Sequence, residues 1–242
     1  MHTFPLWLHI AANVSLGLAL VSALIIIADE FARPQHMWVM NLVWPLCALF
    51  GGPLWLAFYF RWERGMPRSH GAHRQMRGMA KSKPFWVITT TSASHCGAGC
   101  TLGDILAEWL VFFLPGLAVA FGWKSLFSEK IYAVWLIDFI FAFAFGIGFQ
   151  YYTIKPMRNL SPKQGLIEAL KADTSTVIAW QIGMYGFMAL VQFGWAMRVY
   201  GAPIDPTHPE FWLMMQIAML CGFVTSYPVN WVLLKMGIKE GM

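Results

Sequence analysis

Residues 85–121 read FWVITTTSASHCGAGCTLGDILAEWLVFFLPGLAVAF, a stretch without a lysine or an arginine. As one straight helix it would be about 55 Å long, whereas the hydrocarbon core of a bilayer is about 30 Å thick. The stretch must therefore tilt, protrude or break. Three glycines and a proline offer places for a break: Gly97, Gly99, Gly103 and Pro115. We expect a long membrane helix, the third of the chain, that is broken near Gly97–Gly103.

The composition of the whole chain indicates a membrane protein. Hydrophobic residues make up 58% of the 242 positions and charged residues only 12%, whereas soluble domains carry about 25% charged residues. An ordinary soluble globule and a disordered chain are both excluded. The net charge of +5 does not indicate nucleic-acid binding, because the basic residues occur in short runs between apolar segments. The four cysteines lie inside apolar segments, which excludes a secreted disulfide framework.

Six segments are long and apolar enough to cross a bilayer. They are residues 6–28, 37–60, 85–121, 131–153, 174–197 and 211–234. Each should be helical, because lipid cannot hydrogen-bond to open backbone groups. The predicted fold class is an all-α membrane protein, a bundle of six transmembrane helices. Dividing the third segment into two spans would give seven.

The basic residues favour six spans over seven. With six, one side of the membrane receives residues 61–84, residues 154–173 and the tail from 235, which together hold 13 of the 17 Lys and Arg. The positive-inside rule then places the N- and C-termini in the cytoplasm. A seventh span would move a basic cluster to the other side and weaken this asymmetry. We expect a multi-pass protein of the bacterial inner membrane.

The polar segment 61–84 separates two parts of the chain. It contains His70 and His73, which we interpret as part of a basic loop on anionic headgroups, with a metal-capture site as the alternative. We therefore divide the chain into residues 1–84, a two-helix hairpin plus this cytoplasmic loop, and residues 85–242, a four-helix membrane domain.

Three acidic residues lie inside predicted spans: Asp104, Glu108 and Asp138. Each costs about 2.5–3.5 kcal/mol near the bilayer centre, and no Lys or Arg lies deep enough in the sequence pattern to pair with them. Asp104 and Glu108 are four residues apart and share a helix face. The functional interpretation is a cation path toward the outer surface. The alternative is that neutral acids form hydrogen bonds between helices.

The densest chemical signal is the run His95-Cys96-x3-Cys100 followed by Asp104. Thiolate and imidazole ligands select soft or borderline ions such as Cu(I) or Zn(II). On a regular helix His95 points about 100° away from Cys96, so the four side chains converge only if the helix unwinds near the glycines. The alternative is that small Gly, Ala, Ser and Cys residues allow close helix packing. Both interpretations remain open.

Further polar residues on the spans complete the expected ion pathway. Its members are Glu108, Asp138, Gln181, Gln216, Tyr227 and Asn230. Taken singly, each amide or hydroxyl is also explained by a hydrogen bond between helices. Prolines inside the spans should kink their helices and can open space for a cavity: Pro45, Pro53 and Pro228.

Three blocks of the sequence resemble an uncharacterised prokaryotic integral-membrane family, catalogued as a domain of unknown function. The blocks are SHCGAGCTLGDILAEW (94–109), LKADTSTVIAWQIGMYGFMAL (170–190) and residues 211–242, which end in SYPVNWVLLKMGIKEGM. The resemblance covers about residues 85–242 and rests on H-C-x3-C-x-L-G-D and on Y-P-V-N-W with G-I-K-E-x-M. It implies a helical membrane domain and no particular reaction. The residues it singles out are His95, Cys96, Cys100, Asp104, Asp173, Gln181, Tyr185, Gln216, Tyr227, Pro228 and Asn230.

The predicted function is a small permease or binding protein for Cu(I) or Zn(II), with His95, Cys96, Cys100 and Asp104 as ligands. The alternative is a structural or accessory subunit of a membrane complex, and a lesser alternative is a membrane redox or haem protein. An enzyme is disfavoured, because the chain contains neither hydrolase motifs nor a nucleotide-binding loop. The expected partners are the lipid bilayer, a small cation and either a second copy or a complex subunit, with no nucleic acid.

Overall fold

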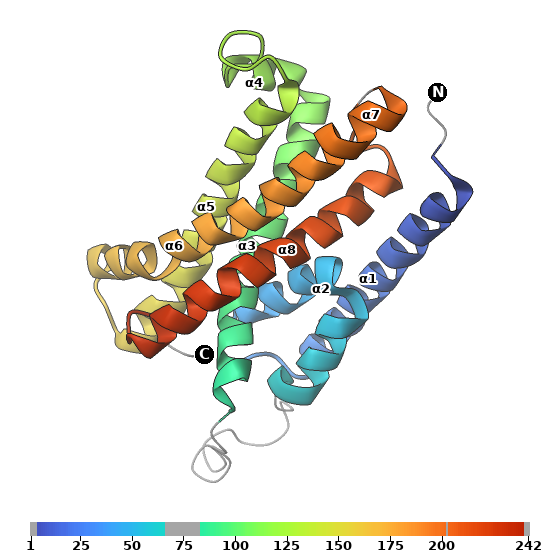
Figure 1. The fold of residues 1–242 in the computed structure, drawn as a ribbon. Coiled ribbons are helices and arrows are strands. Elements are labelled where there is room, and N and C mark those ends of the chain that lie inside the picture. Colours follow the sequence, from blue (N-terminus) through green and yellow to red (C-terminus); the bar gives the residue numbers. More distant parts are fainter. Residues whose placement is uncertain (1–3, 66–82, 202, 240–242) are drawn as a thin grey trace.

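The computed structural model describes residues 4–65, 83–201 and 203–239, which form helices and no strand (Figure 1). The helices are α1 (Leu6–Ala32), α2 (Met40–Phe58), η1 (Tyr59–Glu63), α3 (Phe85–Phe113), α4 (Pro115–Ala120), α5 (Lys130–Arg158), α6 (Pro162–Ala189), η2 (Leu190–Ala196), α7 (Met197–Tyr200) and α8 (Pro209–Lys235). Six of the helical stretches are long and apolar enough to cross a membrane, as predicted. The chain is an all-helical, multi-pass integral membrane protein. His70 and His73 lie outside the described residues.

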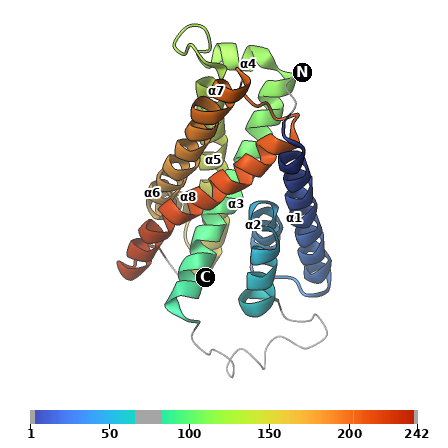
Figure 2. The same ribbon diagram turned by 45° about the vertical axis from the view of Figure 1, so that its right-hand side comes forward.

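The bundle is built around α3. Helix α3 packs along α5, and α6 packs along α8 (Figure 1). Helix α1 stands at the margin, where it contacts α2 and α8 (Figure 2). The outward side of α1 carries exposed Leu18, Val21 and Leu24, which suits a surface that faces lipid chains.

Helix α3 runs without interruption from Phe85 to Phe113, so the predicted break near Gly97–Gly103 is wrong. The chain leaves the helix at Leu114, whose φ and ψ are −124° and 71°, and Pro115 begins the short α4. The stretch 85–121 is therefore one long helix followed by a short one.

The glycines of α3 serve close packing and not unwinding. A Cβ on Gly99 would lie 2.7 Å from the backbone nitrogen of Gly146 on α5. A Cβ on Gly103 would lie 2.5 Å from the backbone nitrogen of Ala142. The absence of these side chains lets α3 and α5 approach closely, which is the usual role of small residues between membrane helices.

Helix α2 is folded back on itself. Gly52 has φ 51° and ψ −134°, a backbone conformation that interrupts the helix, and Pro53 follows it. The ring of Trp44, before the turn, lies 5.9 Å from the ring of Phe58 and 6.1 Å from that of Tyr59, both after it. One straight helix would separate these rings by about 20 Å. Residues 40–63 therefore form a re-entrant hairpin of two short helices.

Both ends of this hairpin lie at one end of the bundle. The side-chain nitrogen of Gln35 donates to the carbonyl of Glu63 at 2.9 Å, and Arg64 donates to Asp29 at 3.0 Å. The segment thus enters and leaves on the same side, although its length and composition suit a span.

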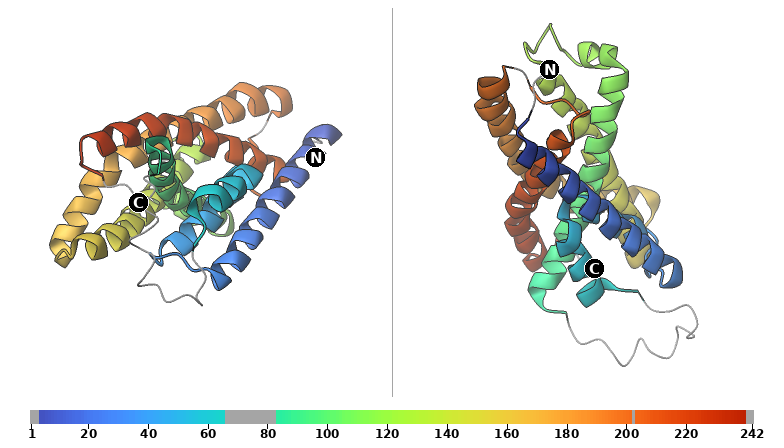
Figure 3. Two further views of the ribbon diagram at one scale, coloured as in Figure 1. Left: turned by 90° about the horizontal axis from the view of Figure 1, so that it is seen from below. Right: turned by 90° about the vertical axis from the view of Figure 1, so that its right-hand side faces the viewer.

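The placement of both termini on one side assumed a second crossing at residues 40–63. In the structure residues 40–63 turn back, and the start of α1 and the end of α8 lie at opposite ends of the bundle (Figures 1 and 3), while the side of the membrane on which each terminus lies stays a prediction. The physical reason is local. Gly52 has a positive φ, which residues with a side chain rarely adopt. Pro53 has no N–H to donate the hydrogen bond that would continue the helix.

Candidate cation site

The centre of the site is a pair of buried carboxyl groups. Asp104 on α3 and Asp138 on α5 are 1% and 3% exposed, and their carboxyl groups lie close enough to interact electrostatically. The close approach of α3 to α5 at Gly103 places them together. A third helix, α6, contributes Tyr185, whose hydroxyl donates to Oδ2 of Asp138 at 2.6 Å.

Much of the hydrogen-bonding capacity of this pair is unused. Among the described residues, no donor reaches either oxygen of Asp104 or Oδ1 of Asp138. Two carboxylates in contact repel strongly where water is excluded, so such a pair holds a proton unless a cation neutralises it. The arrangement is chemically suited to exchanging a proton for a cation.

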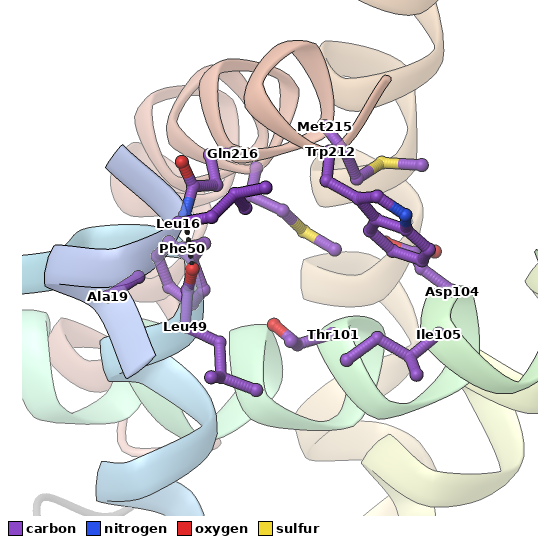
Figure 4. A pocket seen from close by; sticks show the side chains of 11 residues that line it. Leu16, Ala19, Leu49, Phe50, Thr101, Asp104, Ile105, Trp212, Met215 and Gln216 are labelled. Carbon is purple, nitrogen blue, oxygen red and sulfur yellow. Dashed lines mark hydrogen bonds between the residues drawn. The ribbon is translucent and has the colours of Figure 1, made fainter. Parts of the chain in front are cut away.

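Asp104 also faces a cavity of about 150 Å³ at the tip of the re-entrant hairpin (Figure 4). The cavity is lined by Leu16, Ala19, Leu49, Phe50, Thr101, Asp104, Ile105, Trp212, Met215, Gln216 and Met219. These residues come from α1, the hairpin, α3 and α8. The cavity therefore connects the hairpin tip to the acid pair.

The hairpin tip is held in place by Gln216. The carbonyl of Leu49 would normally accept from the residue four positions later, which is Pro53 and has no N–H. The side-chain nitrogen of Gln216 supplies the missing donor at 2.7 Å, and Ser15 donates to the amide oxygen of Gln216 at 2.7 Å. Gln216, predicted as part of the ion path, thus positions one wall of the cavity.

Cys100 and Cys96 lie on α3 about one and two helical turns before Asp104. Cys96 and Cys100 are fully buried and lie about one helical turn apart on the same side of α3. Cys47, on the first arm of the hairpin, is close to Cys96, and its thiol donates to the carbonyl of Ser94 at 3.1 Å. All these cysteines are free.

His95 turns away from the thiols. Its Nε2 lies 3.0 Å from the hydroxyl of Thr153 on α5, and that hydroxyl donates to the carbonyl of Phe149 at 2.9 Å. Nε2 is therefore the donor toward Thr153, and Nδ1 is left as an acceptor that no described residue meets.

The four predicted metal ligands do not gather around one point. His95 faces α5, Cys96 and Cys100 face each other, and Asp104 faces Asp138. Within residues 4–65, 83–201 and 203–239, no group of three or more His, Cys, Asp and Glu side chains is arranged to hold a metal ion. The reason is that α3 stays a regular helix, which directs successive side chains about 100° apart.

A second polar cluster lies toward the C-terminal end of the bundle. The ammonium of Lys239 lies 2.9 Å from Oδ1 of Asp173 and 2.9 Å from Oδ1 of Asn230, and Ser92 donates to the same Asn230 oxygen at 3.1 Å. Oδ2 of Asp173 meets no donor among the described residues. His95 lies close enough to Asp173 and Lys239 to interact electrostatically with both.

Other predicted path residues lie outside these clusters. Glu108 lines a separate cavity of about 120 Å³, together with Lys130 and Asp205. Burial disfavours ionisation of Asp205, but hydrogen bonds from Thr207 outweigh this and hold the pKa of Asp205 below its usual value.

The two remaining path residues differ in their burial. Gln181 is 2% exposed, and neither atom of its amide has a partner among the described residues. Tyr227 lies at the periphery, where its hydroxyl is 3.4 Å from the carbonyl of Trp86, and it joins neither cluster.

Sequence reasoning missed Lys239 and the hairpin turn. Lys239 was assigned to a cytoplasmic tail and Asp173 to a loop, whereas the structure buries both. Asp173 was marked only by the family resemblance, and Lys239 lies inside its G-I-K-E-x-M motif. The Gly52-Pro53 dipeptide signalled a kink but not a reversal.

A family model described as "Domain of unknown function (DUF4396)" matches residues 85–239. No curated protein and no solved structure matches the chain. The matched region contains the acid pair, Cys96 and Cys100, and the ion pair of Lys239 and Asp173, while the re-entrant hairpin precedes it.

Proposed function

The chain belongs to the family described as a domain of unknown function (DUF4396), and since that description carries no activity, we propose a function from the geometry of the site. The protein is a small permease that exchanges a cation for a proton at Asp104 and Asp138. The observation that carries the proposal is the buried carboxyl of Asp104, which meets no donor among the described residues, lies close to Asp138 and belongs to a residue that lines a cavity.

The re-entrant hairpin supports this assignment. Non-helical backbone at membrane depth is tolerated only where it is buried in protein or lines a cavity. Interrupted helices near the midplane often form the binding sites of secondary transporters. Here the interruption at Gly52 lies next to Leu49 and Phe50, which line the same cavity as Asp104.

Further buried polar atoms without a partner among the described residues lie on the same three helices as the acid pair. They belong to Gln181, Gln150, His95 and Asp173, on α3, α5 or α6. Buried polar groups are normally satisfied by protein or water, so unsatisfied ones are expected where water or ions enter. We assign these groups to the proposed route between the acid pair and the other membrane surface.

The orientation in the membrane follows from charge. Among the described residues, segments at the end of the bundle where α8 ends hold 10 of the 13 Lys and Arg. The positive-inside rule then assigns that end to the cytoplasm and the N-terminus to the outside. We place the protein in the cytoplasmic membrane of a prokaryote.

Copper transport is a second candidate. Cys96 and Cys100 lie side by side and are buried, and two thiolates suffice for a linear Cu(I) site. His95 and Asp104 would not belong to such a site. Elemental analysis of the purified protein beside a C96S/C100S double variant tests it, and equal copper content in both would count against it.

Proton exchange is testable in proteoliposomes that contain a pH-sensitive dye. External Na⁺, K⁺, Zn²⁺ and tetramethylammonium are added one at a time. The expected result is that at least one of them drives proton release from wild-type liposomes, and that Asp104→Asn and Asp138→Asn abolish it. Glu168→Gln is the matched control, because Glu168 is partly exposed and, among the described residues, pairs with Lys171 and Arg158 far from the acid pair in the sequence. Proton movement that is equal in all variants, or absent with every cation, would refute the proposal.

A further inference from the structure

The cavity at the hairpin tip has a mainly apolar wall. Aliphatic, aromatic and thioether side chains form most of it, among them Leu16, Phe50, Ile105 and Met215 (Figure 4). A cavity of about 150 Å³ with an apolar lining accommodates a molecule of roughly benzene's size.

Nearly all polar side chains of the wall are already engaged. The amide of Gln216 uses its nitrogen for Leu49 and its oxygen for Ser15. Thr101 donates to the carbonyl of Gly97 at 2.8 Å.

The indole of Trp212 is engaged in the same way, since it donates to the carbonyl of Pro206 at 2.8 Å. Asp104 is the exception, because neither of its oxygens meets a donor among the described residues. The mainly apolar lining therefore contains one acidic residue, whose carboxylate oxygens are themselves buried at the edge of the cavity.

This combination disfavours a bare hard cation and favours an organic one. Ca²⁺ and Mg²⁺ require six or more oxygen ligands, and the wall has one carboxyl to offer. An ammonium ion with small alkyl groups places its charge at the carboxylate and its carbon atoms against the apolar wall. The face of Trp212 also suits such a cation, because aromatic rings attract ammonium groups.

We infer that the cavity binds a small organic ammonium ion at Asp104, and this inference rests on the proposed function because it names the cargo. When the ammonium ion enters, one proton leaves the acid pair, so charge is conserved and no bond to carbon forms or breaks. The titratable groups that face Asp104 are Asp138, Tyr185, Glu108 and Cys100.

Tetramethylammonium is a suitable probe, because it keeps its charge at every pH and has the size of the cavity. Binding to the full-length protein in nanodiscs is measured by calorimetry. tert-Butanol has the same number of heavy atoms and no charge, and it should not bind at Asp104. Asp104→Asn should weaken tetramethylammonium binding about 10- to 100-fold, because the quaternary ion has no N–H and depends on the negative charge of the carboxylate.

A second variant tests binding in the cavity without changing the carboxyl of Asp104. Ala19 is 2% exposed and lines the cavity, so Ala19→Met should fill the space and block binding while Asp104 is retained. Gly17→Met is the matched control on the same helix, because a Cβ there meets nothing within 4 Å. Binding that neither Asp104→Asn nor Ala19→Met reduces would overturn the inference.

The experiments can refute the exchange function and the organic cargo independently of each other. Tetramethylammonium that binds at Asp104 without moving protons in liposomes supports the cavity assignment and refutes the exchange function. Proton exchange driven by Na⁺ or K⁺, with no tetramethylammonium binding, supports the exchange function and refutes the organic cargo.

Discussion

The ammonium of Lys239 lies 2.9 Å from Oδ1 of Asp173, and neither side chain has any exposed surface. The contact joins the segment after α8 to α6, and Asn230 holds the same ammonium from α8. Burying two charges is costly, and the pair compensates for that cost only while both partners are present.

Lys239→Met should therefore lower the free energy of unfolding by about 3–5 kcal/mol, because it leaves the carboxylate of Asp173 buried without its cation. Adding Asp173→Asn should restore part of this stability by removing the uncompensated charge. The measurement is reversible unfolding in mixed detergent micelles. The control is Lys171→Met, which breaks an exposed pair with Glu168 and should cost less than about 1 kcal/mol. Similar losses for the two lysine substitutions would contradict a buried ion pair.

Gly52→Ala should destabilise the protein through backbone strain alone. A Cβ at Gly52 meets nothing within 4 Å, but its φ of 51° with ψ of −134° is rarely adopted by other residues. The expected loss is about 1–3 kcal/mol in the same unfolding assay. Gly17→Ala on α1, which has equal space and helical backbone, should be neutral or slightly stabilising. If both substitutions behaved alike, residues 40–63 would not turn at Gly52.

The hairpin also predicts that the two termini lie on opposite sides of the membrane. A cleavable tag at the N-terminus should be cut by protease added to intact spheroplasts, whereas the same tag at the C-terminus should be cut only after lysis. The physical reason is the number of crossings, since residues 40–63 return to the side from which they came. Protection of both tags in intact spheroplasts would restore the six-crossing topology.

The sequence predicts the membrane fold correctly because few backbone structures can cross a lipid bilayer. Apolar segments of sufficient length must be helices, and their number followed from counting. Two interpretations of α3 competed, and the packing one holds for its glycines. Gly99 and Gly103 touch α5, and the helix does not unwind to gather His95, Cys96 and Asp104.

The remaining features depend on tertiary geometry, which a hydropathy pattern does not contain. A hairpin and a kinked span share the same composition, and tertiary contacts such as that between Trp44 and Tyr59 distinguish them. The sequence marks Asp104 and Asp138 as acids inside apolar segments but does not pair them, because their rotational positions on two helices decide whether they meet. Lys239 lies beyond the last apolar segment, so a rule based on hydropathy assigns it to water.

Gly103→Ala tests whether the approach of α3 to α5 creates the acid pair. The new Cβ would lie 2.5 Å from the backbone nitrogen of Ala142, so the two helices must separate. We expect a loss of about 1–3 kcal/mol of stability, as for other overpacked sites, together with loss of proton exchange.

Gly148→Ala is the matched control for this substitution, because a Cβ there meets nothing within 4 Å on α5. It should keep both stability and exchange, since alanine favours a helix more than glycine does. Stability in micelles and proton release from liposomes are measured on the same preparations. If Gly103→Ala unfolded earlier yet exchanged protons at the wild-type rate, close contact between Asp104 and Asp138 would not be required. Exchange would then have to proceed through Asp104 and the cavity without the second carboxyl.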